Sequence, residues 1–154
     1  MNDMKLRTRH LKTPSYGFTL LEIMIVLAIV VILGGMGWNG YRHIIQKAGR
    51  SEGRAALLQL LLQEERHFSH QHRYQGFTAG SGTGGFKWYS GATPETSAYA
   101  LSARACDGET LSTCVLLKAN PGAEGVNRNY GDTECGALYL DSRGGRRADG
   151  KDCW

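Results

Sequence analysis

The chain has 154 residues, 42% of them hydrophobic and 21% charged, which is typical of one folded domain and excludes a wholly disordered protein. Its 21 glycines follow no three-residue repeat, which excludes collagen. The net charge is +4, but residues 1–17 hold four cations and one acid, whereas the rest holds 14 Lys and Arg against 13 Asp and Glu. The basic charge is therefore concentrated at the N-terminus, and a general nucleic-acid-binding composition is not indicated.

A long apolar segment follows the basic N-terminus. Residues 18–38 contain one charged residue, Glu22, and as an α-helix they would span roughly 31 Å, about one hydrocarbon core of a membrane. A core helix of a soluble protein is the weaker alternative, because the rest of the chain has too little hydrophobic mass to surround it. The positive charges before the segment predict a cytoplasmic N-terminus and a C-terminal part outside the cytoplasm.

The order of these features is the reverse of a secretory signal, because the polar leader ends at Gly17 and the apolar run begins at once. Gly17, Phe18 and Glu22, with the run Thr-Leu-Leu between the last two, resemble the class III leader of type IV pilins. The resemblance implies that a prepilin peptidase/N-methyltransferase cleaves between Gly17 and Phe18 and methylates Phe18.

The same resemblance implies a location and a set of partners. The helix would anchor the protein once through the bacterial inner membrane and would later be part of an extracellular pilus. Other pilin subunits and the inner-membrane assembly platform are the implied partners.

Glu22 would cost roughly 2.5–3.5 kcal/mol inside a membrane unless its charge is paired. The amine that cleavage creates at Phe18 lies one helical turn away in the same chain, and the Phe18 amine of an adjacent subunit is the other candidate. The resemblance favours the adjacent subunit and so implies a role for Glu22 in assembly. Type IV pilins often carry a proline where this chain has Gly34–Gly40, so we expect this glycine-rich stretch to soften the helix without a kink.

The remaining chain predicts a helix and then a sheet. Apolar residues recur at helical spacing from Tyr41 to about Tyr74, and charges including Glu64 are expected to mark the solvated side. A glycine-rich loop at 76–85 follows. Strand-like runs are found at 86–89, 98–105, 113–118 and 136–141, separated by turn-rich segments.

The second half of the helix is also similar to that of PilE-like minor pilins. The expected fold is α+β, with one long N-terminal helix packed on an antiparallel sheet of about four strands. The expected domains are a leader at 1–17, a hydrophobic helix at 18–40 and a globular domain at 41–154, with the sheet and a disulfide loop in 86–154.

Four cysteines lie in the part expected outside the cytoplasm: Cys106, Cys114, Cys135 and Cys153. An even number in an oxidising compartment predicts two disulfide bonds, for which three connectivities exist. Sequential pairing is favoured because Cys106 and Cys114 flank one hairpin-like turn. The pair Cys135–Cys153 is also similar to the C-terminal disulfide loop of PilE-like pilins. Zinc is disfavoured because no C-x-x-C spacing is found.

His67 and His70 share a helix face with Glu64, which allows a metal site, although a solvated helix end where cations suit the dipole is the simpler interpretation. Neither a phosphate loop nor a spaced nucleophile and base is found. The sequence therefore predicts no catalytic residues, no enzyme, no cofactor and no metal.

A basic loop is the candidate contact to DNA phosphates. It contains Arg143, Arg146, Arg147 and Lys151 and would be closed by the last two cysteines. The alternative is a solvated charged loop, since three aspartates lie among these cations.

The predicted function is a minor type IV pilin, a structural subunit in the assembly of pili that serve adhesion, twitching motility or DNA uptake. Two alternatives stay open. One is a DNA-binding competence pilin that uses the loop 143–151, and the other is a pseudopilin of a type II secretion system.

Overall fold

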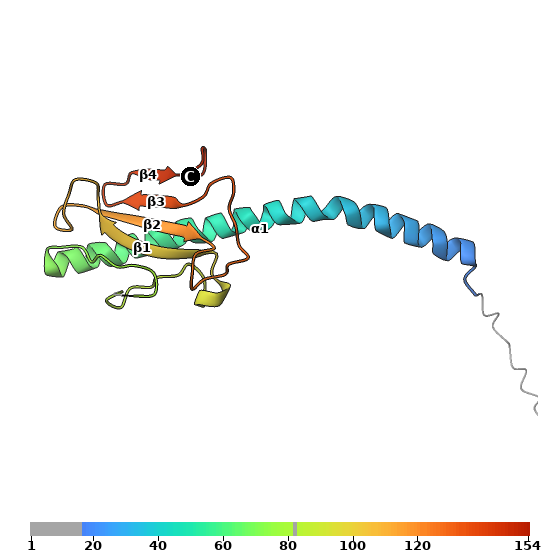
Figure 1. Cartoon of the computed structure of the whole chain (residues 1–154), viewed down its shortest axis with the longest axis horizontal. Helices are drawn as coiled ribbons and strands as arrows, with labels where there is room; N and C mark the ends of the chain where they lie inside the picture. Colours follow the sequence, from blue (N-terminus) through green and yellow to red (C-terminus); the bar gives the residue numbers. More distant parts are fainter. Residues whose placement is uncertain (1–16, 82) are drawn as a thin grey trace, which may run out of the picture. The chain divides into compact units, whose positions relative to one another are not determined.

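The computed structural model describes residues 17–81 and 83–154, with residues 36–39 described by their backbone alone. The chain divides into two compact units, Met1–Asn39 and Gly40–Trp154, and one helix, α1 (Leu20–Gln71), runs through both. The second unit also contains a short 3-10 helix and four strands (Figure 1). These are η1 (Pro94–Thr96), β1 (Tyr99–Ala105), β2 (Val115–Pro121), β3 (Leu138–Asp141) and β4 (Arg146–Ala148).

α1 begins with a capped turn. The side-chain oxygen of Thr19 accepts a hydrogen bond from the backbone N–H of Glu22 (3.2 Å), so Thr19 is the N-cap and Glu22 lies at the positive end of the helix dipole. The large apolar side chains that follow are exposed, by 79% at Leu20 and 46% at Ile23. Among the described helices, α1 is the one long and apolar enough to cross a membrane, by length and composition.

The four strands form an antiparallel meander in chain order, β1-β2-β3-β4. Successive side chains point to opposite faces of a sheet, and one face carries the apolar residues of the core. Figure 1 shows the sheet lying across the C-terminal part of α1, which contributes Leu57 and Leu60 to that core. The sheet contributes Tyr99, Leu101, Leu117, Leu138 and Leu140, each at most 1% exposed.

Two glycines one helical turn apart allow α1 to approach two tyrosine rings. A Cβ atom at Gly53 would lie 2.8 Å from Cδ2 of Tyr99, and one at Gly49 would overlap the ring of Tyr130. The two rings pack against each other with centroids 5.4 Å apart. Any larger residue at these two positions would push the helix and the rings apart.

A buried polar network joins α1 to the segment before β3. Arg50 donates to both carboxylate oxygens of Asp132 (2.6 and 2.7 Å) and to Glu134 (2.6 Å). Asp132 also accepts hydrogen bonds from the Tyr99 hydroxyl (3.0 Å) and the Cys135 N–H (3.1 Å). Burial alone would raise the pKa of Asp132, but these hydrogen bonds lower it below its ordinary value, so the carboxylate stays ionised.

Three features differ from the sequence-based expectations. The helix ends at Gln71 and not at about Tyr74, because His72 adopts a left-handed conformation (φ 56°). The run 86–89 forms no strand and pairs only through an isolated bridge between Tyr89 and Ala100. The fourth strand is β4, which has no apolar alternation.

Glu64 is buried, and its expected position on the solvated side was wrong. The chain after α1 folds back over it, and Glu64 Oε2 accepts a hydrogen bond from the Gln75 N–H (2.8 Å). Its other oxygen, Oε1, has no partner among the described residues. Burial raises the pKa of Glu64 to about 7.

Candidate nucleic-acid interface on the sheet

The face of the sheet opposite α1 carries a row of polar side chains. The strand register sets Lys118 of β2 between Ser102 of β1 and Tyr139 of β3, and it sets Tyr139 beside Arg147 of β4. Arg104 lies two residues after Ser102 and therefore shares its face. Because these residues alternate with the buried ones, their side chains project from the same outer face.

Tyr139 lies at the centre of this row. The Lys118 ammonium is 5.7 Å and the Arg147 guanidinium 5.9 Å from the centroid of the Tyr139 ring, both within the range of a cation–π contact. Arg104 and Arg147 line a cavity of about 310 Å³ together with Tyr139. We term the set Arg104, Lys118, Tyr139 and Arg147 the basic face.

Two carboxylates border the basic face. Arg104 donates to Asp107 (2.7 Å), and this bond lowers the pKa of Asp107. Both side chains are mostly exposed, so the pair contributes little and Arg104 can exchange Asp107 for another anion. The Tyr139 hydroxyl donates to Asp149 (3.2 Å), and burial together with this neighbouring charge raises the pKa of Tyr139, so the phenol stays protonated.

The other two cations of the basic face are free to bind an anion. Neither Lys118 nor Arg147 takes part in an ion pair within the described residues. Ammonium and guanidinium groups bind phosphate oxygens, and a set of them on one surface can follow a nucleic-acid backbone. The arrangement therefore suits a polyanion.

The structure does not bring the four cations of the predicted basic loop together. Arg143 donates to Glu109 of the β1–β2 loop (2.7 Å), and the Arg146 guanidinium lies 5.7 Å from the ring centroid of Trp154. Arg146 and Arg147 are neighbours on β4 and so point to opposite faces. Lys151 is exposed beyond the sheet, and only Arg147 joins the basic face.

The residues of the predicted leader junction lie at the start of the described chain. Gly17 and Phe18 precede α1, and Phe18 is 79% exposed. The four cations of the leader lie within residues 1–16, outside the described residues.

Both disulfide bonds follow the sequential connectivity. Cys106 is bonded to Cys114 and Cys135 to Cys153, with Cα atoms 5.5 and 5.7 Å apart. The first bond closes the β1–β2 loop that Arg143 contacts, and the second links the segment before β3 to the residues after β4.

The histidines at the end of α1 are separated from Glu64. His67 packs edge-on against Phe86, with centroids 5.8 Å apart, while Glu64 is turned into the core. Within residues 17–81 and 83–154, no group of three or more His, Cys, Asp or Glu side chains is arranged to hold a metal ion.

Sequence reasoning missed Arg104, Lys118 and Tyr139. Arg104 and Lys118 lie within strand-like runs, and Tyr139 is flanked by two leucines, so the alternation was a usable signal. The register that sets them side by side cannot be obtained from one run alone.

Comparisons with known proteins found two matching sequence models and a similar solved structure. A sequence model described as "Type IV minor pilin ComP, DNA uptake sequence receptor" matches residues 40–139, and one described as "Prokaryotic N-terminal methylation motif" matches residues 13–38. Among solved structures, the chain is similar to the non-core minor pilin PilV of Neisseria meningitidis, with 17% identity, a TM-score of 0.46, and coverage of 70% of this chain and 90% of that one. No curated protein matches the chain.

Proposed function

The chain belongs to the type IV minor pilin ComP family, and from this we propose that it is a pilus subunit that binds double-stranded DNA through its basic face. The family match includes Arg104, Lys118 and Tyr139, and it ends before Arg147. A minor pilin that serves DNA uptake needs a phosphate-binding surface on its globular part, and the basic face provides one.

The observation that carries the proposal is the grouping of three cations from three different strands around Tyr139. Phosphate contacts supply most of the sequence-independent affinity for DNA. Cations held on a rigid sheet lose less freedom on binding than cations on a loop. Lys118 and Arg147 form no ion pair with any described residue, so they meet phosphate without first breaking one within that part of the chain.

The test compares two triple variants of residues 40–154 with equal loss of charge. One replaces Arg104, Lys118 and Arg147 by Ala, and the control replaces the exposed residues Lys47, Arg66 and Arg128 by Ala. For the first variant we expect the affinity for duplex DNA to fall at least about tenfold, since each charge-assisted bond contributes on the order of 1.5–3 kcal/mol before compensation. The slope of log affinity against log salt should shrink by roughly 0.9 for each phosphate that the variant no longer binds.

Fluorescence anisotropy of a labelled duplex between 50 and 300 mM salt measures both quantities. The control variant should bind nearly as the parent does. Equal weakening of the two variants would mean that DNA responds to net charge alone, and the basic face would be rejected.

The cations outside the basic face are proposed as peripheral contacts. Arg143 is already paired with Glu109, and Arg146 lies against Trp154, so each must leave a partner to reach DNA. Replacing Arg143, Arg146 and Lys151 by Ala should therefore weaken DNA binding less than the triple change on the basic face.

The family also supports a route to the pilus. We infer that prepilin peptidase cleaves between Gly17 and Phe18, that Phe18 is methylated, and that the apolar helix holds the protein in the inner membrane until it joins other pilins in an extracellular filament. Glu22 would then meet the Phe18 amine of a neighbouring subunit. The role is structural and binding rather than enzymatic.

A further inference from the structure

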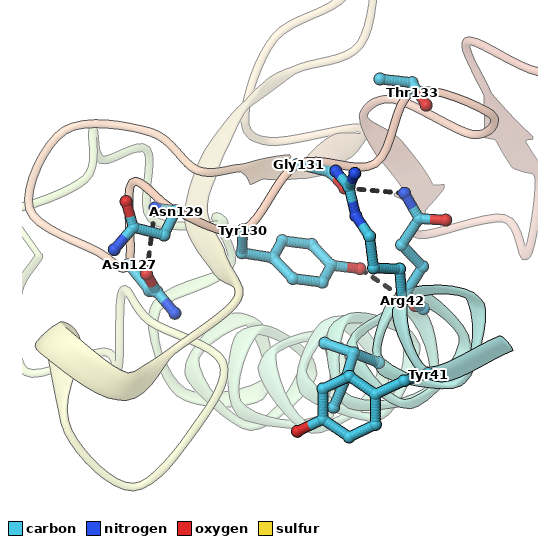
Figure 2. A pocket seen from close by; sticks show the side chains of 9 residues that line it. Tyr41, Arg42, Asn127, Asn129, Tyr130, Gly131 and Thr133 are labelled. Carbon is cyan, nitrogen blue, oxygen red and sulfur yellow. Dashed lines mark hydrogen bonds between the residues drawn. The ribbon is translucent and has the colours of Figure 1, made fainter. Parts of the chain in front are cut away.

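A groove lies beside α1 near the start of the second unit. It has a volume of about 370 Å³ and is lined by the helix segment 41–46 and the loop 127–133. Figure 2 shows Arg42 on the helix, Asn127 and Asn129 on the loop, and the ring of Tyr130 reaching from the loop toward the helix. The volume is within the range of about 300–1,000 Å³ that small-molecule sites have. We term this groove the α1 groove.

Hydrogen bonds hold the walls of the α1 groove in position. The Tyr130 hydroxyl donates to the Gln46 carbonyl (3.1 Å), and the Gln46 amide donates to the Gly131 carbonyl (3.2 Å). On the loop, the Asn127 side-chain oxygen accepts a hydrogen bond from the Asn129 N–H (3.0 Å). The groove is therefore formed before anything binds, and a ligand need not order the loop.

The polar side of the α1 groove has the chemistry of an anion site. It contains the Arg42 guanidinium, the side-chain amides of Asn127 and Asn129, and the Thr133 hydroxyl, and none of the described residues that line it is an acid. Arg42 is exposed and takes part in no ion pair among the described residues. A guanidinium with neutral hydrogen-bond donors beside it suits the oxygens of a phosphate group.

The carboxylates near this loop are paired with other cations. Asp132 and Glu134 both accept hydrogen bonds from Arg50. Glu124 pairs with Arg128 of the loop (3.2 Å). These acids neutralise their own partners, so the charge of Arg42 is left for a ligand.

The other side of the α1 groove indicates which kind of phosphate it suits. Tyr41 and Ile45 line the groove from the helix and are 63% and 45% exposed, so a ligand meets apolar surface next to the polar donors. Arg42 also follows the apolar run 18–38 by only four residues of α1, about 6 Å along the helix axis. Tyrosine and basic side chains are favoured at the boundary between hydrocarbon and water. Basic pockets beside a membrane span bind the head groups of anionic lipids.

We propose that the α1 groove binds the head group of an anionic phospholipid before the chain joins a pilus. Arg42 and the loop amides bind the lipid phosphate, and Tyr41 and Ile45 contact the start of the acyl chains. The bound lipid ties the loop 127–133 to the membrane surface until the chain is assembled. The proposal rests on the membrane stage of the proposed function and not on the binding of DNA.

Native mass spectrometry of the full chain in an uncharged detergent tests the proposal. The protein is titrated with dioleoylphosphatidylglycerol, which is anionic, or with dioleoylphosphatidylcholine, which has the same acyl chains and no net charge. We expect the anionic lipid to bind at least about fivefold more tightly, because one cation beside an anionic head group contributes roughly that factor.

Two variants should remove this preference in different ways. Arg42→Gln deletes the cation, and Asn129→Asp puts a negative charge into the groove with almost no change of shape. The controls Lys47→Gln and Gln71→Glu change the charge equally at exposed positions of α1 that do not line the groove. We expect the groove variants to lose at least about fivefold in affinity for the anionic lipid and the controls less than about twofold, with unchanged melting temperatures.

The affinity of the same variants for duplex DNA separates this test from that of the basic face. It should stay at the parental level, because none of the four changes touches the basic face. A chain that fails the DNA test and keeps the lipid preference would contradict the DNA-binding proposal alone.

Three results would overturn the lipid assignment. One is equal affinity for the two lipids. Another is equal weakening by Arg42→Gln and Lys47→Gln, since surface charge alone would then attract the lipid. The third is a loss of DNA affinity in the groove variants with unchanged lipid affinity, which would make the groove a nucleic-acid contact.

Discussion

Glu64 and Asp132 show how hydrogen bonds decide the charge of two buried carboxylates of the same unit. Asp132 receives two hydrogen bonds from Arg50, together with those from Tyr99 and Cys135, and stays ionised. Glu64 receives one hydrogen bond, from Gln75, and no cation pairs with it in the described part of the chain. A buried carboxylate without a cation is stabilised by keeping its proton, so the two residues respond differently to pH.

Glu64→Gln should remove part of the pH dependence of stability. Because burial raises the pKa of Glu64 from 4.5 to about 7 in the folded chain, the folded state binds this proton more tightly than the unfolded state does. The resulting stability is fully present below pH 4.5 and is lost as the pH rises to about 7, by at most about 3 kcal/mol. Urea unfolding at pH 5 and pH 8 measures the loss, which we expect to be smaller in the variant.

The exposed residue Glu124 provides the control. Glu124→Gln should keep the pH dependence of the parent, because the Glu124 side chain is 90% exposed in the folded chain. An unchanged pH dependence in Glu64→Gln would show that Glu64 is not the residue that holds the proton.

At the scale of elements, close packing of α1 on two tyrosines depends on the absence of side chains at two helical positions. Gly53→Ala raises helix propensity by about 1 kcal/mol, but the new Cβ would lie 2.8 Å from the fully buried ring of Tyr99. Overpacking of this kind costs about 1–3 kcal/mol and outweighs the gain in propensity, so we expect net destabilisation of up to about 2 kcal/mol in urea unfolding.

Gly131→Ala is the control for this substitution, because nothing lies within 4 Å of a Cβ atom there. It should be neutral or stabilising by up to about 1 kcal/mol, through the unfolded state. A stabilised Gly53→Ala variant would contradict the tight packing.

The two disulfide bonds should contribute unequally to the stability of the fold. Cys135–Cys153 closes a longer loop than Cys106–Cys114, with 18 against 8 residues of separation. The loss of chain entropy in the unfolded state therefore stabilises the fold by about 3 kcal/mol for the longer loop and about 2.5 kcal/mol for the shorter one. Both cysteines of the longer loop also belong to the core. Cys153→Ser should therefore lower the melting temperature more than Cys106→Ser. Non-reducing peptide mapping of the parent checks the connectivity itself. Four free thiols or a Cys106–Cys135 link would contradict the pairing.

Local periodicity explains which elements could be predicted from the sequence. α1, β1, β2 and β3 each carry their own apolar pattern, so the helix, the antiparallel sheet and the family resemblance were all accessible. β4 carries none, and it is a strand through its pairing with β3. The run 86–89 carries a strand pattern but pairs only through Tyr89.

The basic face and Glu64 were missed for different reasons. Arg104, Lys118 and Arg147 come from three strands, and the sequence does not contain the register that joins them. Glu64 follows Leu57 by seven residues and Leu60 by four, so its helical position lies on the buried face of α1, and only its charge suggested solvent. The segment around Gln75 then supplies its hydrogen bond.

At the scale of the whole molecule, Glu22 should matter for assembly rather than for insertion. Glu22→Ala makes the helix more apolar, and it keeps the backbone N–H that bonds to Thr19, so the start of α1 should stay capped. In the pairing that we propose, removing the carboxylate would leave the Phe18 amine of a neighbouring subunit without its partner. We expect normal amounts in the membrane and a severalfold loss from sheared pili, measured by immunoblotting.

Thr19→Val provides the matched control, because it removes the cap and keeps the charge. It should assemble better than Glu22→Ala does. Incorporation of Glu22→Ala into pili at the parental level would contradict the pairing.

The bond between Arg50 and Asp132 has a consequence for export. On the route to the pilus that we propose, Arg50 emerges roughly 4–16 s before Asp132, which lies 82 residues later in the chain, at a synthesis rate of about 5–20 residues per second. During that interval Leu57 and Leu60 would lie outside the membrane without the sheet that later covers them. A tethered chain in this state is a target for holdase chaperones and proteases. The yield of the pilin should therefore depend on the length of this interval as well as on the stability of the finished fold.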